Sequence, residues 1–201
     1  MIAGREVAVP LRGLPCGRLR GRPCGGAADP CGGIRLTDGS RREVGPLTAA
    51  DAQAEQDFVR ALSLQSRYRR FHVGLPQLPP ALLRRLVDVD QQRHVALAVW
   101  QAQPQRRIVA DARYVRDADG PGADFALAVA DDHQGLGLGR QLLQRLLSHA
   151  ASQGIEVLHG DVLADNGPMI GLVRALGGTL LAQADVAGVL YARLPAAAGA
   201  G

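Results

Sequence analysis

Apolar residues recur at helical spacing in four segments of the chain, which predicts four amphipathic helices. Each segment begins with residues that are typical of helix starts. These starts are Thr48 with Asp51 three residues later, Pro80, the end of a glycine-rich loop at Gly139, and Pro168. The first segment carries an apolar stripe from Phe58 to Leu64, and Gly154 and Gly177 are placed to end the last two helices.

Short runs that are rich in β-branched and other apolar residues predict strands between these helices. The predicted strands cover residues 44–47, 94–100, 107–115, 123–130, 155–162, 179–183 and 186–194. Short turns join the second strand to the third and the sixth to the seventh, and one strand–loop–helix–strand unit lies in the middle. This order predicts a mixed α/β fold, with a central, mostly antiparallel, twisted sheet flanked by about four helices.

The two ends of the chain lack this periodicity. Residues 1–36 are dense in Gly, Arg, Pro and Cys, and such a segment buries too little apolar surface to offset the entropy lost on ordering. We therefore expect a disordered extension over residues 1–36, a folded domain over residues 41–195 and a flexible tail over residues 196–201.

Composition narrows the class of protein. The chain has 201 residues, which suits one sizeable domain, and 47% of them are hydrophobic but only 3% aromatic. We therefore expect an aliphatic core. All 23 basic residues are arginines, and the formal net charge is +4. A GC-rich genome explains this composition, although the positive charge also suits an anionic ligand.

Several function classes lack support in the sequence. Aromatic residues do not interleave with basic runs, so we expect no nucleic acid partner. Cys16, Cys24 and Cys31 do not have zinc-site spacing, so we expect no metal. No apolar run approaches the length of a membrane span, and no convincing signal peptide is present. These observations favour a cytoplasmic protein without a membrane partner.

A glycine-rich loop follows predicted strand 123–130 and opens directly into a helix. Its residues are Gln134, Gly135, Leu136, Gly137, Leu138 and Gly139. Glycines at alternate positions let the backbone approach a ligand and turn its N–H groups inward. The free N–H groups and the positive dipole end of the helix lie at the same place, and Arg140 adds a cation. The loop is therefore a candidate pyrophosphate site.

Three interpretations of this loop compete. It can be a connection whose glycines serve only tight packing. It can belong to a dinucleotide-binding fold, in which Asp161 would bind a ribose. That fingerprint needs its third glycine where Arg140 stands, and it leaves the preceding hairpins unexplained. A Walker loop is excluded because the Gly-Lys-Ser/Thr sequence is missing.

The third interpretation rests on a family resemblance. Gln134-x-x-Gly137-x-Gly139 resembles the Gln/Arg-x-x-Gly-x-Gly/Ala signature of the GNAT acetyltransferase superfamily. The segment from Asn166 to Gly177 resembles the part of that family which follows the loop, where the asparagine contacts the pantetheine arm. Upstream, residues 62–71 and 86–98 resemble the catalytic domain of bacterial Pat-type protein lysine acetyltransferases.

The resemblance implies a GNAT fold over residues 41–195 that uses acetyl-CoA as a co-substrate and needs no metal. The loop and Arg140 would bind the pyrophosphate, and Asn166 the pantetheine. The implied function is acetyl transfer to a primary amine, with a protein lysine as the preferred acceptor, on a metabolic enzyme such as an acyl-CoA synthetase. Acetylation of a small amine and non-catalytic sensing of acyl-CoA remain alternatives.

Acetyl transfer requires a neutral amine, so a base or an ordered water must take the amine proton. Asp124 is the candidate base, because it stands where the family resemblance expects a glutamate. Alternation places it on one face with Ala126 and Ala128. By the same resemblance, the main-chain N–H near Val129 would polarise the thioester carbonyl. Val173 stands where many members of the superfamily carry a tyrosine that protonates the leaving thiolate.

Other polar residues near these motifs have simpler interpretations. For His133 a solvent-exposed loop position is the favoured one. For Arg67, Arg69 and Arg70 a solvated helix face is favoured, although they could also steer an acidic acceptor or bind the 3′-phosphate of the cofactor.

Overall fold

A computed structural model of the chain describes residues 32–196. The three cysteines and most of both predicted disordered ends lie outside these residues. Across residues 32–196, no helix has the length and apolar character needed to cross a membrane.

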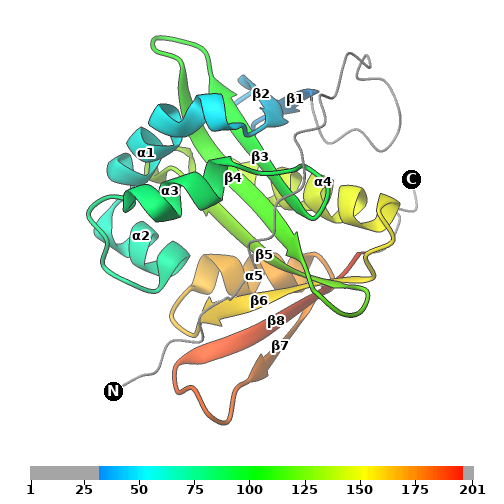
Figure 1. The fold of residues 1–201 in the computed structure, drawn as a ribbon. Helices are drawn as coiled ribbons and strands as arrows, with labels where there is room; N and C mark the ends of the chain where they lie inside the picture. The colour runs from blue at the N-terminus through cyan, green and yellow to red at the C-terminus, as the bar shows by residue number, and fades with distance from the viewer. Residues whose placement is uncertain (1–31, 197–201) are drawn as a thin grey trace.

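The described residues form eight strands and five α-helices (Figure 1). The strands are β1 (Gly32–Arg35), β2 (Arg41–Pro46), β3 (His94–Gln101), β4 (Arg107–Arg116), β5 (Gly122–Val129), β6 (Val157–Leu163), β7 (Thr179–Ala182) and β8 (Val189–Pro195). The α-helices are α1 (Ala52–Ala61), α2 (Leu64–Phe71), α3 (Pro80–Val87), α4 (Leu138–Ser152) and α5 (Gly167–Ala175).

All eight strands belong to one sheet, in the order β1-β2-β3-β4-β5-β6-β8-β7. Every neighbouring pair is antiparallel except β5 and β6, which are parallel. Helix α4 connects these two strands, as a parallel pair requires a crossover. The predicted mixed, mostly antiparallel sheet is therefore confirmed.

Helices cover both faces of the sheet (Figure 1). Neighbouring residues of β4 show the two faces, because successive side chains of a strand point to opposite sides. Arg113 bonds to Glu55 of α1 and to the Leu86 carbonyl of α3, whereas the Tyr114 hydroxyl bonds to His149 of α4. Helices α1 and α3 therefore lie on one face and α4 on the other.

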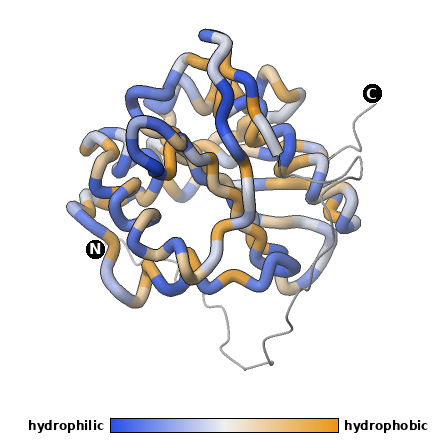
Figure 2. Tube along the Cα trace, turned by 90° about the horizontal axis from the view of Figure 1, so that it is seen from above, coloured by the Kyte–Doolittle hydropathy of each residue, from blue (hydrophilic) through white to orange (hydrophobic). Residues whose placement is uncertain are grey.

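The core between these layers is mainly aliphatic, as the composition predicts. On β3, all residues from Val95 to Trp100 are buried, and on α4 the buried positions recur at helical spacing from Leu138 to Ala150. Figure 2 shows helices that carry both hydrophobic and hydrophilic positions, as expected for elements that bury one face.

The first predicted helix is in fact two helices. The Asp51 carboxylate accepts hydrogen bonds from the Thr48 N–H and hydroxyl, which confirms the predicted start. The chain then leaves helical geometry at Leu62 and restarts after Ser63, whose hydroxyl accepts the Ser66 N–H. This break leaves Leu64 65% exposed, so the stripe predicted to continue to Leu64 ends at Leu62.

The folded part also begins earlier than the expected start at residue 41. Strand β1 pairs with β2 and lies inside the segment predicted to be disordered. Ile34 and Leu36 are 1% and 2% exposed, so two apolar side chains anchor a glycine-rich stretch that has no periodicity of its own. At the other end, Ala196 is buried and donates its N–H to the Glu156 carbonyl, although the sequence assigned it to the tail.

Candidate functional site

The sheet forks between β5 and β6. Only residues 122–124 of β5 pair with residues 157–159 of β6, although both strands continue beyond this pairing. The separated edges border a pocket of about 850 Å³, which is also lined by residues of α2, of the glycine loop and of α5. Such a pocket at a strand divergence can admit an elongated ligand between the strands.

The glycine loop closes one end of this pocket. Gly135 and Gly137 have φ angles of +75° and +76°, which residues with a side chain rarely adopt. Gly137 is the N-cap of α4. The helix therefore begins inside the loop, and its first N–H groups are directed toward the pocket end. Gln134, Gly139 and Arg140 also line the pocket.

Helix α2 braces the loop through Asp131. The Asp131 carboxylate accepts hydrogen bonds from the Ser63 N–H (2.8 Å), the Ser63 hydroxyl (2.8 Å) and the Ser66 hydroxyl (2.7 Å). Burial alone would raise the pKa of Asp131, but these hydrogen bonds outweigh it and lower the pKa. The Gln134 amide extends the brace by donating to the Ser66 hydroxyl and the Val129 carbonyl.

Strand β1 and the turn after it brace the opposite side of the loop. The Thr37 N–H donates to the Leu136 carbonyl at 3.2 Å, and the Gln141 amide of α4 donates to the Arg35 carbonyl at 2.7 Å. Strand β1, which lies within the segment 1–36 predicted to be disordered, and the turn after it therefore support the candidate phosphate site. The sequence does not predict this supporting role, because residues 35–37 contribute only main-chain atoms to the two hydrogen bonds.

Asn166 lies at the start of α5. Its side-chain oxygen accepts the Met169 N–H at 3.3 Å and so caps the helix. Asn166 also lines the pocket. Its amide nitrogen remains a donor that a ligand in the fork could use.

Asp124 lies where the two strands separate. It lines the pocket together with Ala126 and Ala128, which follow it on the same face of β5. Asp124 is a solvent-exposed residue, yet desolvation by the surrounding pocket atoms raises the pKa of its carboxyl to about 6. His159 and Asp161 act in opposite directions, since the first lowers this pKa and the second raises it. A carboxylate with such a pKa is suited to general-base chemistry near neutral pH.

The main chain of Val129 faces the fork. The Ala130 N–H donates to the Val109 carbonyl of β4, and successive residues of a strand present their N–H groups to opposite edges. The Val129 N–H is therefore directed away from β4 and toward the gap between β5 and β6. It can act as a hydrogen-bond donor to a carbonyl held there.

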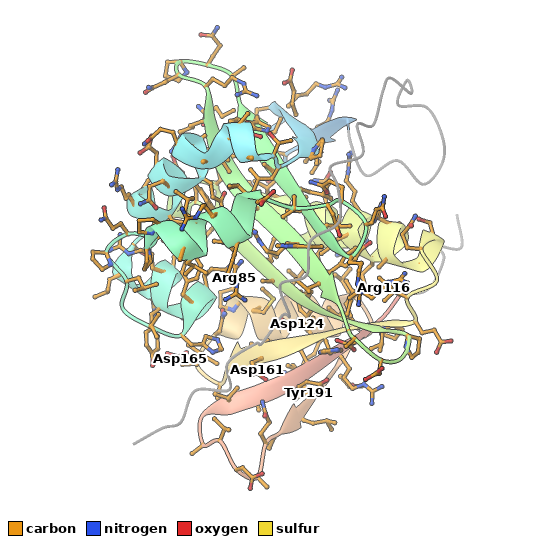
Figure 3. The ribbon with its side chains drawn as sticks, viewed as in Figure 1. Arg85, Arg116, Asp124, Asp161, Asp165 and Tyr191 are labelled. Atoms are coloured by element: carbon orange, nitrogen blue, oxygen red, sulfur yellow. The ribbon has the colours of Figure 1, made fainter. Side chains whose placement is uncertain are left out.

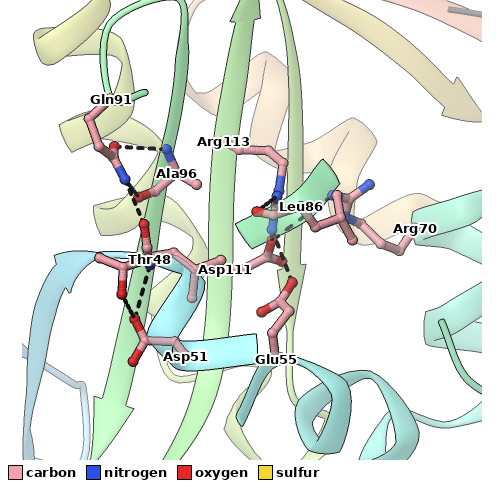
Figure 4. A network of polar contacts seen from close by, with 10 residues as sticks. Thr48, Asp51, Glu55, Arg70, Leu86, Gln91, Ala96, Asp111 and Arg113 are labelled. Carbon is pink, nitrogen blue, oxygen red and sulfur yellow. Dashed lines mark hydrogen bonds and ion pairs between the residues drawn. The ribbon is translucent and has the colours of Figure 1, made fainter. Parts of the chain in front are cut away.

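A buried group of charged side chains (Figure 4) reaches the pocket through one member, Arg70. Arg113 donates to Asp111 and Glu55 and to the Leu86 carbonyl. Burial and the Asp111 carboxylate together raise the pKa of Glu55 to about 8, against the lowering effect of Arg113. Arg70 joins this group at 3.9 Å from Asp111 and lines the pocket.

Two sequence interpretations are wrong at this site. The Arg70 side chain is 12% exposed, so it does not belong to a solvated helix face. His133 is 5% exposed, and its ring bonds to Arg42 and Asp132, so it is not a solvent-exposed loop residue. Both positions depend on partners far away in the sequence. No group of three or more metal-ligating side chains is present within residues 32–196.

Known proteins resemble this chain over most of its length. Residues 59–177 match the acetyltransferase (GNAT) family. The chain is 33% identical over 143 residues to acetyltransferase PA5475 of Pseudomonas aeruginosa, which covers 71% of this chain and 77% of that protein. It is 29% identical over 150 residues to acetyltransferase Pat of Mycolicibacterium smegmatis, which covers 70% of this chain but 44% of Pat. The structure aligns with the GNAT domain of PAT from S. lividans at a TM-score of 0.76 and 27% identity, over 85% of this chain and 99% of that domain.

The fold, the loop and these relatives define an acyltransferase domain. The chain belongs to the GNAT acetyltransferase family and is an N-acetyltransferase. The similarity to the two Pat proteins supports the Pat-like resemblance seen in the sequence.

Proposed function

We propose that the chain binds acetyl-CoA in the pocket between β5 and β6 and transfers the acetyl group to a primary amine, preferably a protein lysine. One observation carries this proposal. The glycine loop and Asp124 line the same pocket of about 850 Å³. A loop suited to a phosphate and a carboxyl with a pKa of about 6 thus line one pocket.

The loop would hold the pyrophosphate through its backbone. The N–H groups of residues 135–139 lie at the start of α4, where the helix dipole favours an anion. Arg140, in the first turn, would add its charge. The Asn166 amide would bind the pantetheine arm, which is a short chain of amides and therefore suits a neutral donor.

The catalytic step requires a base and a group that stabilises negative charge. Asp124 would take a proton from the acceptor ammonium, directly or through one water. The neutral nitrogen then forms a C–N bond with the thioester carbon, the C–S bond breaks, and its electron pair leaves on the sulfur as a thiolate. The second proton of the nitrogen passes to water or to the departing thiolate, which leaves the neutral amide. The Val129 N–H would stabilise the charge that develops on the carbonyl oxygen.

A thiolate leaving group explains how the site works without the tyrosine of other family members. Val173, which occupies the matching position, is fully buried and has no proton to give. A thiol is acidic enough to leave as the anion. We prefer a protein lysine as the acceptor because the resemblance to Pat-type protein lysine acetyltransferases implies it, and two Pat proteins among the relatives support that resemblance.

Thiol release from acetyl-CoA tests the proposal, with lysine peptides, intact protein acceptors and small amines as separate arms. This chain contains no lysine, so every acetyl-lysine found by mass spectrometry must come from the acceptor. Acetyl-lysine formation that matches thiol release would support the preferred acceptor, whereas turnover with small amines alone would replace it. Saturable acetyl-CoA binding without turnover in any arm would indicate an acyl-CoA sensor.

A further inference from the structure

His159 is the neighbour of Asp124 at the fork. The two residues are register partners and form the last pair of β5 and β6 before the strands separate. Neighbouring strands lie about 5 Å apart, and paired side chains share one face of the sheet. Figure 3 shows the surroundings of this pair, with Asp124, Asp161 and Tyr191 on the neighbouring strands β5, β6 and β8.

Two contacts fix the His159 ring. Its Nε2 atom lies 3.1 Å and 2.9 Å from the two carboxylate oxygens of Asp117, in the turn after β4. On β8, the Tyr191 ring lies 5.6 Å from the imidazole, between ring centroids. The side chain of His159 is 19% exposed, so the ring is held inside the protein and not in bulk solvent.

Two glycines make room for this arrangement. A Cβ atom at Gly122 would lie 2.3 Å from the Asp117 carboxylate and 3.4 Å from the His159 ring. A Cβ atom at Gly160 would lie 2.9 Å from the Phe125 carbonyl oxygen and 3.3 Å from the Asp124 carboxylate. Residues with a side chain at either position would displace the Asp117–His159 pair or the candidate base.

The Asp117 contact fixes the orientation and the tautomer of the ring. A carboxylate accepts hydrogen bonds, so Nε2 carries a proton. With both protons the ring is a cation beside Asp124. The other charged or titratable groups near the pair are Asp161 on β6, Arg70 on α2, and Tyr191 and Arg193 on β8.

We propose that His159, fixed by Asp117, is a positioning residue that as an imidazolium keeps Asp124 ionised and ready to accept the amine proton. The inference rests on the proposed function of Asp124 as the base. In the step itself, one N–H bond of the acceptor ammonium breaks and one O–H bond forms on Asp124, while Asp117 stays a carboxylate and His159 keeps both ring protons. This arrangement explains how an aspartate in a pocket that disfavours its charge can serve as the base.

A titration of the Asp124 carboxyl tests the inference without any catalytic activity. The carboxyl carbon would be followed by NMR in labelled protein and assigned through the Asp124→Asn variant. In His159→Gln, which is neutral at every pH, we expect the midpoint of Asp124 to rise by about one pH unit. His72→Gln, a histidine replacement elsewhere around the pocket, should leave it unchanged.

The pH profile of kcat/KM gives the second reading. The acidic limb of His159→Gln should move up by the same amount, so the variant loses about tenfold at pH 5 and little above pH 8. Its affinity for acetyl-CoA should match that of the wild type. An unchanged Asp124 midpoint, or a rate loss that is constant with pH, would overturn the inference. If the midpoint shifts but wild-type protein acetylates no amine, the proposed function fails and the electrostatic pairing stands.

Discussion

The two ends of the pocket are built in different ways. The loop end uses backbone atoms: glycines with positive φ, a helix start, and hydrogen bonds that tie the loop to α2 and β1. The fork end uses side-chain charges, with Asp124 surrounded by groups from β6 and α2. Backbone geometry demands particular residues at fixed spacing, whereas a charge balance can be reached with many combinations. The loop end should therefore respond to changes of shape and the fork end to changes of charge and pH.

The largest effect should come from removing the base. Asp124→Asn should lower kcat by about 10²- to 10⁴-fold, because the amine loses its proton acceptor. In wild-type protein, kcat/KM should rise with pH through the pKa of about 6 and then level off, because only the ionised carboxylate accepts a proton. Steady-state kinetics across pH would measure both. Asp124→Glu keeps the charge and should retain most activity, and a normal rate for Asp124→Asn would remove the base assignment.

The buried group of charged side chains around Arg113 should control stability. Arg113→Met leaves the Asp111 carboxylate and the Glu55 carboxyl without their main partner, and we expect a loss of about 3–5 kcal/mol in the free energy of unfolding. Urea denaturation would measure it. Arg60→Met is the matched control, because Arg60 forms an exposed pair with Asp57 and should cost less than about 1 kcal/mol. Equal losses for the two variants would contradict a special role for the buried group.

Two glycines with the same backbone conformation make it possible to distinguish an effect on the shape of the loop from general backbone strain. Gly137 and Gly154 have φ angles of +76° and +75°, at opposite ends of α4. Replacement of either by alanine costs about 1–2 kcal/mol of local strain. Only Gly137→Ala should weaken acetyl-CoA binding, by about tenfold, as measured by calorimetry. Similar acetyl-CoA affinities for both variants would indicate that the loop does not bind the cofactor.

The smallest effect concerns the brace between α2 and the loop. Asp131→Ala removes three hydrogen bonds, but the loop keeps its contacts with β1, so acetyl-CoA affinity should fall by roughly fivefold, a change of about 1 kcal/mol. Ser66→Ala removes one of the three bonds and should have a smaller effect in the same titration. An effect of Ser66→Ala larger than that of Asp131→Ala would argue against this brace.

The sequence predicts those parts of the structure that depend on local patterns. Hydrophobic spacing and caps place most helices and strands, and the glycine spacing locates the loop, because local backbone conformation dictates both. Strand β1 could not be predicted, since two buried side chains and pairing with β2 order a segment without periodicity. The burial of Arg70 and His133 could not be predicted for a related reason. Their contact partners, Asp111 and Arg42, lie far away in the sequence. The Asp117–His159 pair likewise forms only when β5 and β6 meet.

A crystal structure of the complex with a non-hydrolysable acetyl-CoA analogue tests the central claim most directly. We predict the pyrophosphate at the N–H groups of residues 135–139, and the carbonyl of the analogue between β5 and β6, beside the Val129 N–H and within reach of Asp124. A cofactor bound outside this fork, or one whose acyl end points away from Asp124, would contradict the account.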